Sequence, residues 1–187
     1  MSASLQGFKG IKKQCGVAAV ELALVAIPFF LMLLGAIEFG RLMYVWNTVQ
    51  EVTRNAARQV VVTDFTNAAA IAAIKNSAVF RATAGSLPAA PEVTNARINV
   101  RYLNAAGNLS TPLPSDPGDN ISACLDSTRT SACIRYVEVC VSTDTTCSSS
   151  GDISFSPLVS FFSTLSTLKI PRSTVRMPVE SLGFVPS

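Results

Sequence analysis

The chain contains no histidine among its 187 residues. This absence excludes histidine-ligated zinc, imidazole acid–base catalysis, and the serine–histidine and cysteine–histidine pairs that activate nucleophiles. Charged residues are also scarce: they make up 14% of the chain, against 49% apolar residues, and the mean hydropathy is +0.38. This composition argues against a conventional hydrolase or metalloenzyme and is unusually apolar for a soluble domain.

Excess positive charge is confined to the N-terminus. The net charge of +3 comes from Lys9, Lys12 and Lys13, because residues 1–16 hold no acidic residue and the rest of the chain is balanced. A protein that binds nucleic acid needs a basic face to displace counterions, so we expect no nucleic-acid partner. The chain also lacks a glycine-rich phosphate loop, and we expect no cofactor.

A long apolar run follows this basic head. Residues 22–37 carry no charge, and only Glu21 and Glu38 interrupt the apolar character of residues 17–39. About 20 residues of helix cross a bilayer, so the run predicts one transmembrane helix. The three lysines before it outnumber Arg41 after it, which places the N-terminus in the cytoplasm and the remainder in the periplasm. No small-x-small cleavage site ends the run, so we expect it to be retained.

Glu21 lies five residues into this apolar segment, where an ionised carboxylate is costly unless it has a partner. One interpretation is that it reaches the headgroup region. The other is that it pairs with a cation inside the membrane or inside an assembly. Cleavage between Gly16 and Val17 would create such a cation, the new α-amino group, on the same chain or on a neighbouring one.

Residues 14–62 resemble the TadE-like proteins, which are minor pseudopilins of the tight-adherence (Flp) pilus system. The resemblance rests on the sequence GVAAVE at residues 16–21, on Pro28, and on GAIEFGRL at residues 35–42. It implies a protein of the bacterial inner membrane whose partners are a prepilin peptidase, other pilins and the pilus-assembly machinery. By resemblance, the peptidase cuts between Gly16 and Val17, and Glu21, at the fifth mature position, aids assembly. Many such sites have an aromatic residue after the glutamate, where this chain has Leu22.

Beyond the apolar run, the pattern predicts that the helix continues outside the membrane to about residue 62. Pro28 removes one helical hydrogen bond and predicts a kink within the membrane. Glu38 and Arg41 are three residues apart, so we expect them to pair near the outer interface. Apolar residues then recur at helical spacing, and this stripe packs either on the chain's own outer domain, which we favour, or on other subunits. The stripe consists of Leu42, Val45, Val49, Val52, Ala56 and Val60.

The remaining residues predict an α+β fold, in which a pilin-like outer domain with a small antiparallel sheet stands on the membrane helix. We therefore divide the chain into a cytoplasmic leader (1–16), a transmembrane and extended helix (17–62) and a periplasmic domain (63–187). Residues 108–126 are a candidate contact loop. The expected elements are a helix at 66–82, a strand at 96–102, a loop at 104–120, a strand at 134–141, a helix from Ser156-Pro157 to Leu168, and a strand at 175–180 that lies at the sheet edge because of Pro178.

Four cysteines cluster within 24 residues of the outer domain. In an oxidising compartment they predict two disulfides, for which three pairings exist. We prefer Cys124–Cys133 and Cys140–Cys147, because each closes a short polar loop. The spacing contains no C-x-x-C pair, so we expect no metal site. Cys15 would leave with the leader.

Three functional hypotheses remain. The first is a minor pilin or pseudopilin that is cleaved after Gly16 and joins a pilus-like assembly. The second is an uncleaved bitopic protein that scaffolds a secretion or pilus machine in the envelope. The third is a membrane-tethered enzyme, based on an S-x-x-K match at Ser166–Lys169. Because the companion motifs of such enzymes are missing, we expect no catalytic activity.

Overall fold

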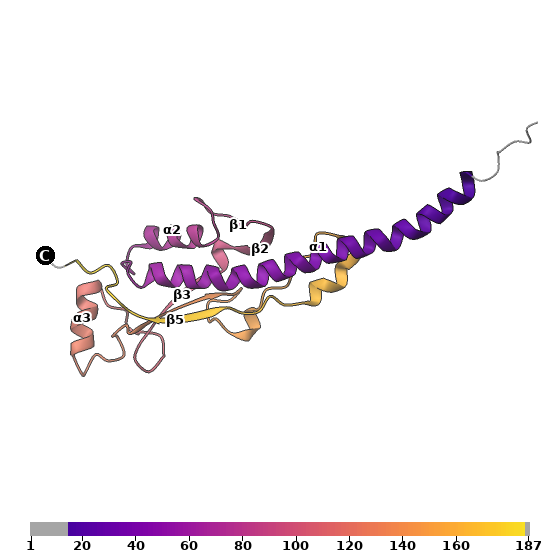
Figure 1. The fold of residues 1–187 in the computed structure, drawn as a ribbon. Helices are drawn as coiled ribbons and strands as arrows, with labels where there is room; N and C mark the ends of the chain where they lie inside the picture. Colours follow the sequence, from indigo (N-terminus) through magenta and orange to yellow (C-terminus); the bar gives the residue numbers. More distant parts are fainter. Residues whose placement is uncertain (1–14, 186–187) are drawn as a thin grey trace, which may run out of the picture.

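The computed structural model describes residues 15–185, and the basic head predicted as a leader therefore lies almost entirely outside the described residues. The fold is α+β, with one long N-terminal helix followed by a domain that contains a small antiparallel sheet, as predicted (Figure 1). The main elements are α1 (Cys15–Val60), α2 (Ala68–Ala78), β1 (Ser86–Leu87), β2 (Ala90–Thr94), β3 (Ile98–Leu103), α3 (Pro117–Leu125), β4 (Tyr136–Val141), the 3₁₀ helix η3 (Ser160–Thr167) and β5 (Thr174–Pro178).

Helix α1 is a single element of 46 residues that continues through Pro28. At 1.5 Å per residue its length is about 69 Å. Figure 1 shows it as one curved helix whose N-terminal part projects from the domain and whose C-terminal part lies within it. It ends two residues before the predicted boundary, and α2 follows after a short turn.

The C-terminal part of α1 forms the centre of the domain core. All six residues of the predicted apolar stripe are buried, each with 4% or less of its surface exposed. They pack against the inner face of the sheet, where Val137 and Val139 of β4 are fully buried in the same cluster. The stripe therefore packs on the chain's own domain, as we had favoured.

Strand β4 is the central strand of the sheet, with β3 and β5 antiparallel on either side. Strand β5 is thus an edge strand, and the edge position expected from Pro178 is correct. Helix α2 and the β1–β2 hairpin lie on the other side of α1, so α1 is enclosed between two layers (Figure 1). Helix α3 lies at the far end of the domain from the projecting part of α1.

Three details of the predicted fold were wrong. Residues 104–120 are not entirely loop, because Asp116 caps α3 by accepting a 2.8 Å hydrogen bond from the backbone N–H of Asp119. The helix expected from Ser156 is instead a 3₁₀ helix over residues 160–167, because the backbone just before it is bound to α1. The β1–β2 hairpin was not predicted at all.

Candidate membrane and assembly site

The first turns of α1 carry the residues predicted to take part in processing and assembly. Gly16, Val17 and Glu21 are all exposed, and Val17 and Glu21 lie about 6 Å apart along the helix axis at 1.5 Å per residue. Within residues 15–185, no ion pair involves Glu21. This part of α1 is therefore exposed, and the carboxylate of Glu21 is accessible to a partner.

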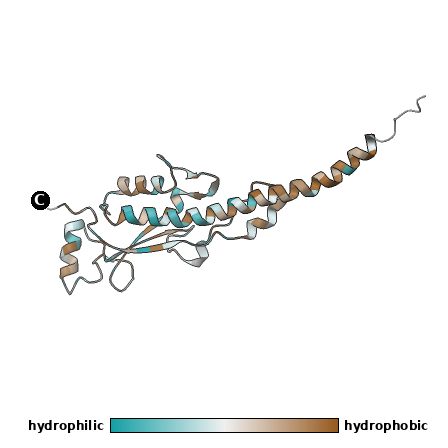
Figure 2. Ribbon diagram, viewed as in Figure 1, coloured by the Kyte–Doolittle hydropathy of each residue, from teal (hydrophilic) through white to brown (hydrophobic). Residues whose placement is uncertain are grey.

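The projecting half of α1 is apolar on every face. An 18-residue window of this helix is apolar enough to cross a membrane, and none of that window is buried in the structure. Figure 2 shows that the ribbon of the projecting helix is mostly hydrophobic, whereas the ribbon of the domain mixes hydrophobic and hydrophilic residues. A soluble helix buries one stripe and exposes polar residues elsewhere, whereas an all-round apolar helix needs a lipid or protein environment. The single apolar helix and its bare surface fit a single-pass membrane protein.

Glu38 and Arg41 lie where α1 enters the domain. Their side chains point to the same side of the helix, and Arg41 Nε lies 3.5 Å from Glu38 Oε2. Both residues are buried, with 1% and 7% of their surfaces exposed. The two residues that the sequence predicted as an interface pair are therefore brought together, but in the interior of the protein.

Glu38 also binds the chain near its C-terminal end. Its Oε1 atom accepts hydrogen bonds of 2.6 and 2.9 Å from the backbone N–H groups of Leu158 and Val159. Since an ionised carboxylate is stabilised by such donors, both of its oxygens are satisfied within the protein. Glu38 thus fixes the segment before η3 against α1.

Arg41 connects α1 to two further segments. Its Nη1 atom donates to the carbonyl oxygen of Ala89 at 3.0 Å and lies 3.4 Å from Glu92 Oε1, both in the β1–β2 hairpin region. Its Nη2 atom donates to the carbonyl oxygen of Ser156, and its guanidinium carbon lies 4.1 Å from the centre of the Phe155 ring. The geometry uses both the fork of donors and the flat cation face that distinguish arginine from lysine.

Glu38, Arg41 and Glu92 form what we term the ion cluster. It contains two carboxylates and one guanidinium, all at least nine-tenths buried, and Glu92 Oε2 has no hydrogen-bond partner among the described residues. Burying ions is costly, and the contacts among the three side chains and with the adjoining backbone offset part of that cost. The sequence indicated the local pair but not Glu92 or the backbone groups, which lie 48 to 121 residues further along the chain.

An open apolar groove of about 550 Å³ lies beside the ion cluster, between α1 and η3. Phe162 packs over Gly35 of α1, with ring carbon Cζ 3.7 Å from the position that a Cβ atom would occupy there. The groove extends along α1 from Gly35 to Trp46. The domain is therefore apolar on the side where the projecting part of α1 enters it.

The geometry described so far concerns one long helix and its junction with the domain. The family model described as TadE-like protein matches residues 16–58. The N-terminal helix is therefore similar to that of TadE-like proteins. The match begins at Gly16 and includes Glu21, Glu38 and Arg41. No curated protein and no solved structure matches the chain.

The TadE-like match indicates a membrane protein related to the Tad pilus, and it supports the resemblance found in the sequence. It covers almost all of α1 and none of the sheet. A pilus-related system implies other pilins as assembly partners. The features that lie beyond the TadE-like helix, including both disulfides, have to be understood from their own geometry.

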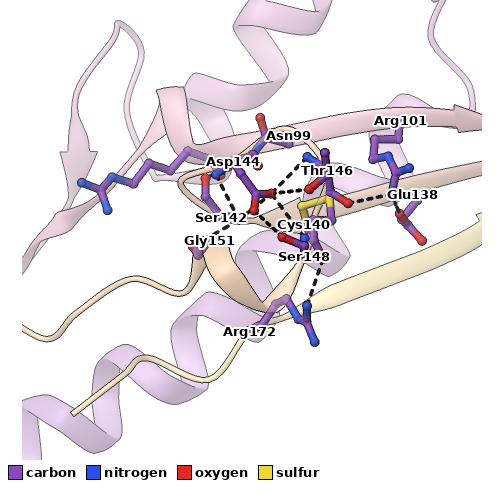
Figure 3. Close-up of a disulfide and its surroundings, with 12 residues drawn as sticks. Asn99, Arg101, Glu138, Cys140, Ser142, Asp144, Thr146, Ser148, Gly151 and Arg172 are labelled. Atoms are coloured by element: carbon purple, nitrogen blue, oxygen red, sulfur yellow. Dashed lines mark hydrogen bonds and ion pairs between the residues drawn. A yellow bond between two sulfur atoms is a disulfide. The ribbon is translucent and has the colours of Figure 1, made fainter. Parts of the chain in front are cut away.

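Both disulfides join the pairs that we had preferred, and both flank β4. Cys124 of α3 is bonded to Cys133, and Cys140 of β4 is bonded to Cys147. Figure 3 shows Asp144 inside the loop that the Cys140–Cys147 disulfide closes, where its carboxylate accepts hydrogen bonds from surrounding hydroxyl and backbone groups. The hydrogen bond from the Ser148 hydroxyl is the main reason that the pKa of Asp144 lies well below its usual range. Such a cross-linked loop suits an oxidising compartment.

The S-x-x-K match does not form a catalytic pair. The Ser166 hydroxyl donates to the carbonyl oxygen of Ser163, while Lys169 Nζ donates to the Ser154 hydroxyl at 2.8 Å. Within the described part of the chain, no three cysteine or acidic side chains form a group that could hold a metal ion.

Proposed function

We propose that this chain is a minor pseudopilin of the tight-adherence pilus system, anchored in the inner membrane by the first half of α1. The observation that carries the proposal is the place of the TadE-like match. It falls on a helix whose first part is bare and apolar and whose second part is packed into a folded domain. This division is what a subunit needs if it is stored in a membrane and later packs against other helices.

The proposed orientation places the N-terminus in the cytoplasm and the domain in the periplasm. Lys9, Lys12 and Lys13 precede the apolar run, and positive residues near a membrane helix favour the cytoplasmic side. Arg41, the basic residue closest to the other end, is paired inside the ion cluster. Paired disulfides in the domain support the same orientation.

Processing is proposed to occur between Gly16 and Val17, by a prepilin peptidase. Nothing lies within 4 Å of the position where a Cβ atom would be added to Gly16. A larger residue there, as in Gly16→Leu, should therefore leave the fold intact while blocking recognition by the peptidase. The new α-amino group of Val17 would provide the cation that Glu21 lacks within the described chain, on its own or on a neighbouring subunit.

The first test is the intact mass of the protein isolated from its native membrane. A chain that begins at Val17, together with an uncleaved Gly16→Leu variant, would support processing. A chain that begins at Met1 or Ser2 would contradict processing and favour the uncleaved bitopic scaffold.

The assembly role of Glu21 is tested by Glu21→Ala, with Leu22→Ala as a control on the same exposed turn. We expect the Glu21 variant to insert in the membrane and to be cleaved, but to lose piliation, because no carboxylate then pairs with the α-amino group. The Leu22 variant should keep piliation. Normal piliation in cells that carry Glu21→Ala would refute this role.

A further inference from the structure

The segment before and within η3 has an unusual composition for the surface of a domain. Residues 153–168 carry no charged side chain, and two large apolar residues of this segment, Leu158 and Phe161, expose 67% and 68% of their surfaces. We name Leu158–Leu168 the foot. Leu165 packs against the domain core, but Leu158 and Phe161 do not, so the exposure of these two side chains needs another explanation.

The position of the foot along α1 can be compared with the thickness of a bilayer. Residues 17–37 span about 30 Å at 1.5 Å per residue, which equals the thickness of a typical hydrocarbon core. The outer edge of the hydrocarbon therefore falls near Ile37, just before the ion cluster. Phe162 of the foot packs over Gly35, on the membrane side of that edge.

The foot is held rigidly at this level. Its first two backbone N–H groups bind Glu38, and the Ser156 carbonyl oxygen just before it accepts from Arg41. Phe161 packs edge-on against Phe162, with ring centres 5.4 Å apart, and its own ring remains exposed. The ring of Phe161 is thus held against Phe162, which itself packs on α1.

Two hydroxyl groups of η3 are bonded to the backbone of the same helix. Ser166 donates its hydroxyl hydrogen to the carbonyl oxygen of Ser163, and Thr167 donates to that of Thr164. Hydroxyl groups that are already bonded to the backbone lose little when they leave water. Lys169, directly after the foot, is exposed and restores a charge where the chain turns back to the domain.

We propose that the foot is a second membrane contact, which places Leu158 and Phe161 in the hydrocarbon of the outer leaflet, beside α1. The proposal rests on the proposed membrane insertion of α1, and it extends the apolar surface of that helix onto the domain. A second attachment point would fix the height and tilt of the domain above the membrane. It would also shield the ion cluster from lipid.

The proposal is tested by depth-dependent fluorescence quenching in the full-length protein. Trp46 is the only tryptophan, and its indole N–H has no hydrogen-bond partner among the described residues, so Trp46→Phe provides a mild background. In this background, Phe161→Trp probes the foot and Phe30→Trp probes the membrane-spanning part of α1. Leu125→Trp is the negative control, because Leu125 is 83% exposed on α3 at the far end of the domain. The variants are reconstituted in phosphatidylcholine vesicles with brominated acyl chains.

We expect the indole introduced at position 161 to be quenched by acyl-chain bromine nearly as strongly as that at position 30, while the indole at position 125 is unaffected. Quenching at position 30 without quenching at position 161 would overturn the proposed membrane contact of the foot and would leave the proposed membrane insertion of α1 intact. Loss of quenching at both positions would overturn both proposals. Emission at position 161 that is blue-shifted, unquenched and dependent on protein concentration would show that a second copy covers the foot, which also overturns the proposal.

Discussion

Removal of the guanidinium from the ion cluster is the sharpest perturbation that the structure suggests. In Arg41→Ala, Glu38 would keep its two backbone donors, but neither it nor Glu92 would have an ion-pair partner among residues 15–185. Breaking a buried ion pair by removing one partner typically destabilises a protein by about 3–5 kcal/mol. Because domains are stable by only about 5–15 kcal/mol, we expect Arg41→Ala to lose a large share of the free energy of unfolding.

The assay is equilibrium unfolding in urea, followed by the fluorescence of Trp46, which lies on the same helix and lines the apolar groove between α1 and η3. Arg54→Ala is the matched control, since Arg54 is exposed on α1 and makes no ion pair with a described residue. That control should change the free energy of unfolding by no more than about 0.5 kcal/mol.

A second comparison separates the loss of the ion pairs from the cost of leaving the carboxylates of Glu38 and Glu92 buried without a cation. The triple variant Glu38→Gln, Arg41→Met, Glu92→Gln removes all charge from the cluster, and it should be more stable than Arg41→Ala alone. Residues in one ion network typically deviate from additivity by about 0.5–3 kcal/mol. If Arg41→Ala were no more destabilising than Arg54→Ala, or if the triple variant were less stable than the single one, the reasoning about buried charge would be refuted.

Two further predictions concern the loop that follows β4. Replacing Cys140 and Cys147 together by serine should lower the free energy of unfolding by about 2–3 kcal/mol, because the cross-link no longer constrains the loop in the unfolded state. Urea unfolding of the variant and the wild type measures this difference. An unchanged unfolding midpoint would contradict the prediction. Asp144→Asn should destabilise the domain at neutral pH, because the carboxylate, whose pKa in the folded protein is depressed mainly by the Ser148 hydrogen bond, is lost. A depressed pKa stabilises the fold above the unfolded value of about 3.9, and this contribution is lost as the pH falls through the folded value. The difference in stability between Asp144→Asn and wild type should therefore shrink between pH 5 and pH 2. A constant difference across that range would argue against the Asp144 carboxylate as the source.

The parts of the fold that could be predicted are those whose signal is local and periodic. The apolar stripe of α1 has helical spacing, which predicted a face that packs on another element, and the structure buries that face within the chain's own domain. Strands β3 and β4 alternate or are rich in β-branched residues, and Pro178 placed β5 at an edge because it lacks an N–H group. In each case a few adjacent residues carry enough information to identify the element.

The parts that were missed depend on contacts between distant residues. Helix α3 is short, and its capping residue Asp116 lies within a stretch rich in proline and glycine, which favoured a loop. The expected helix after Ser156 is a 3₁₀ helix over a shorter range, because the preceding backbone N–H groups bind Glu38 instead. Glu92 carried no local signal at all, since its partner is 51 residues earlier in the chain. Tertiary bonds of this kind override local propensity.

Glu21 and Glu38 lie near the two ends of the apolar run, and they differ in whether their carboxylates are paired within the chain. Glu38 is satisfied within the chain, by Arg41 and by two backbone N–H groups, so the protein needs no external partner at that end. Glu21 has no ion-pair partner among residues 15–185, although both residues lie on the same helix. A carboxylate within a membrane segment is costly unless it is paired. The fold therefore pairs Glu38 and leaves Glu21 without an ion pair among the described residues, and this difference is why we propose Glu21 as the residue that pairs with another group on assembly.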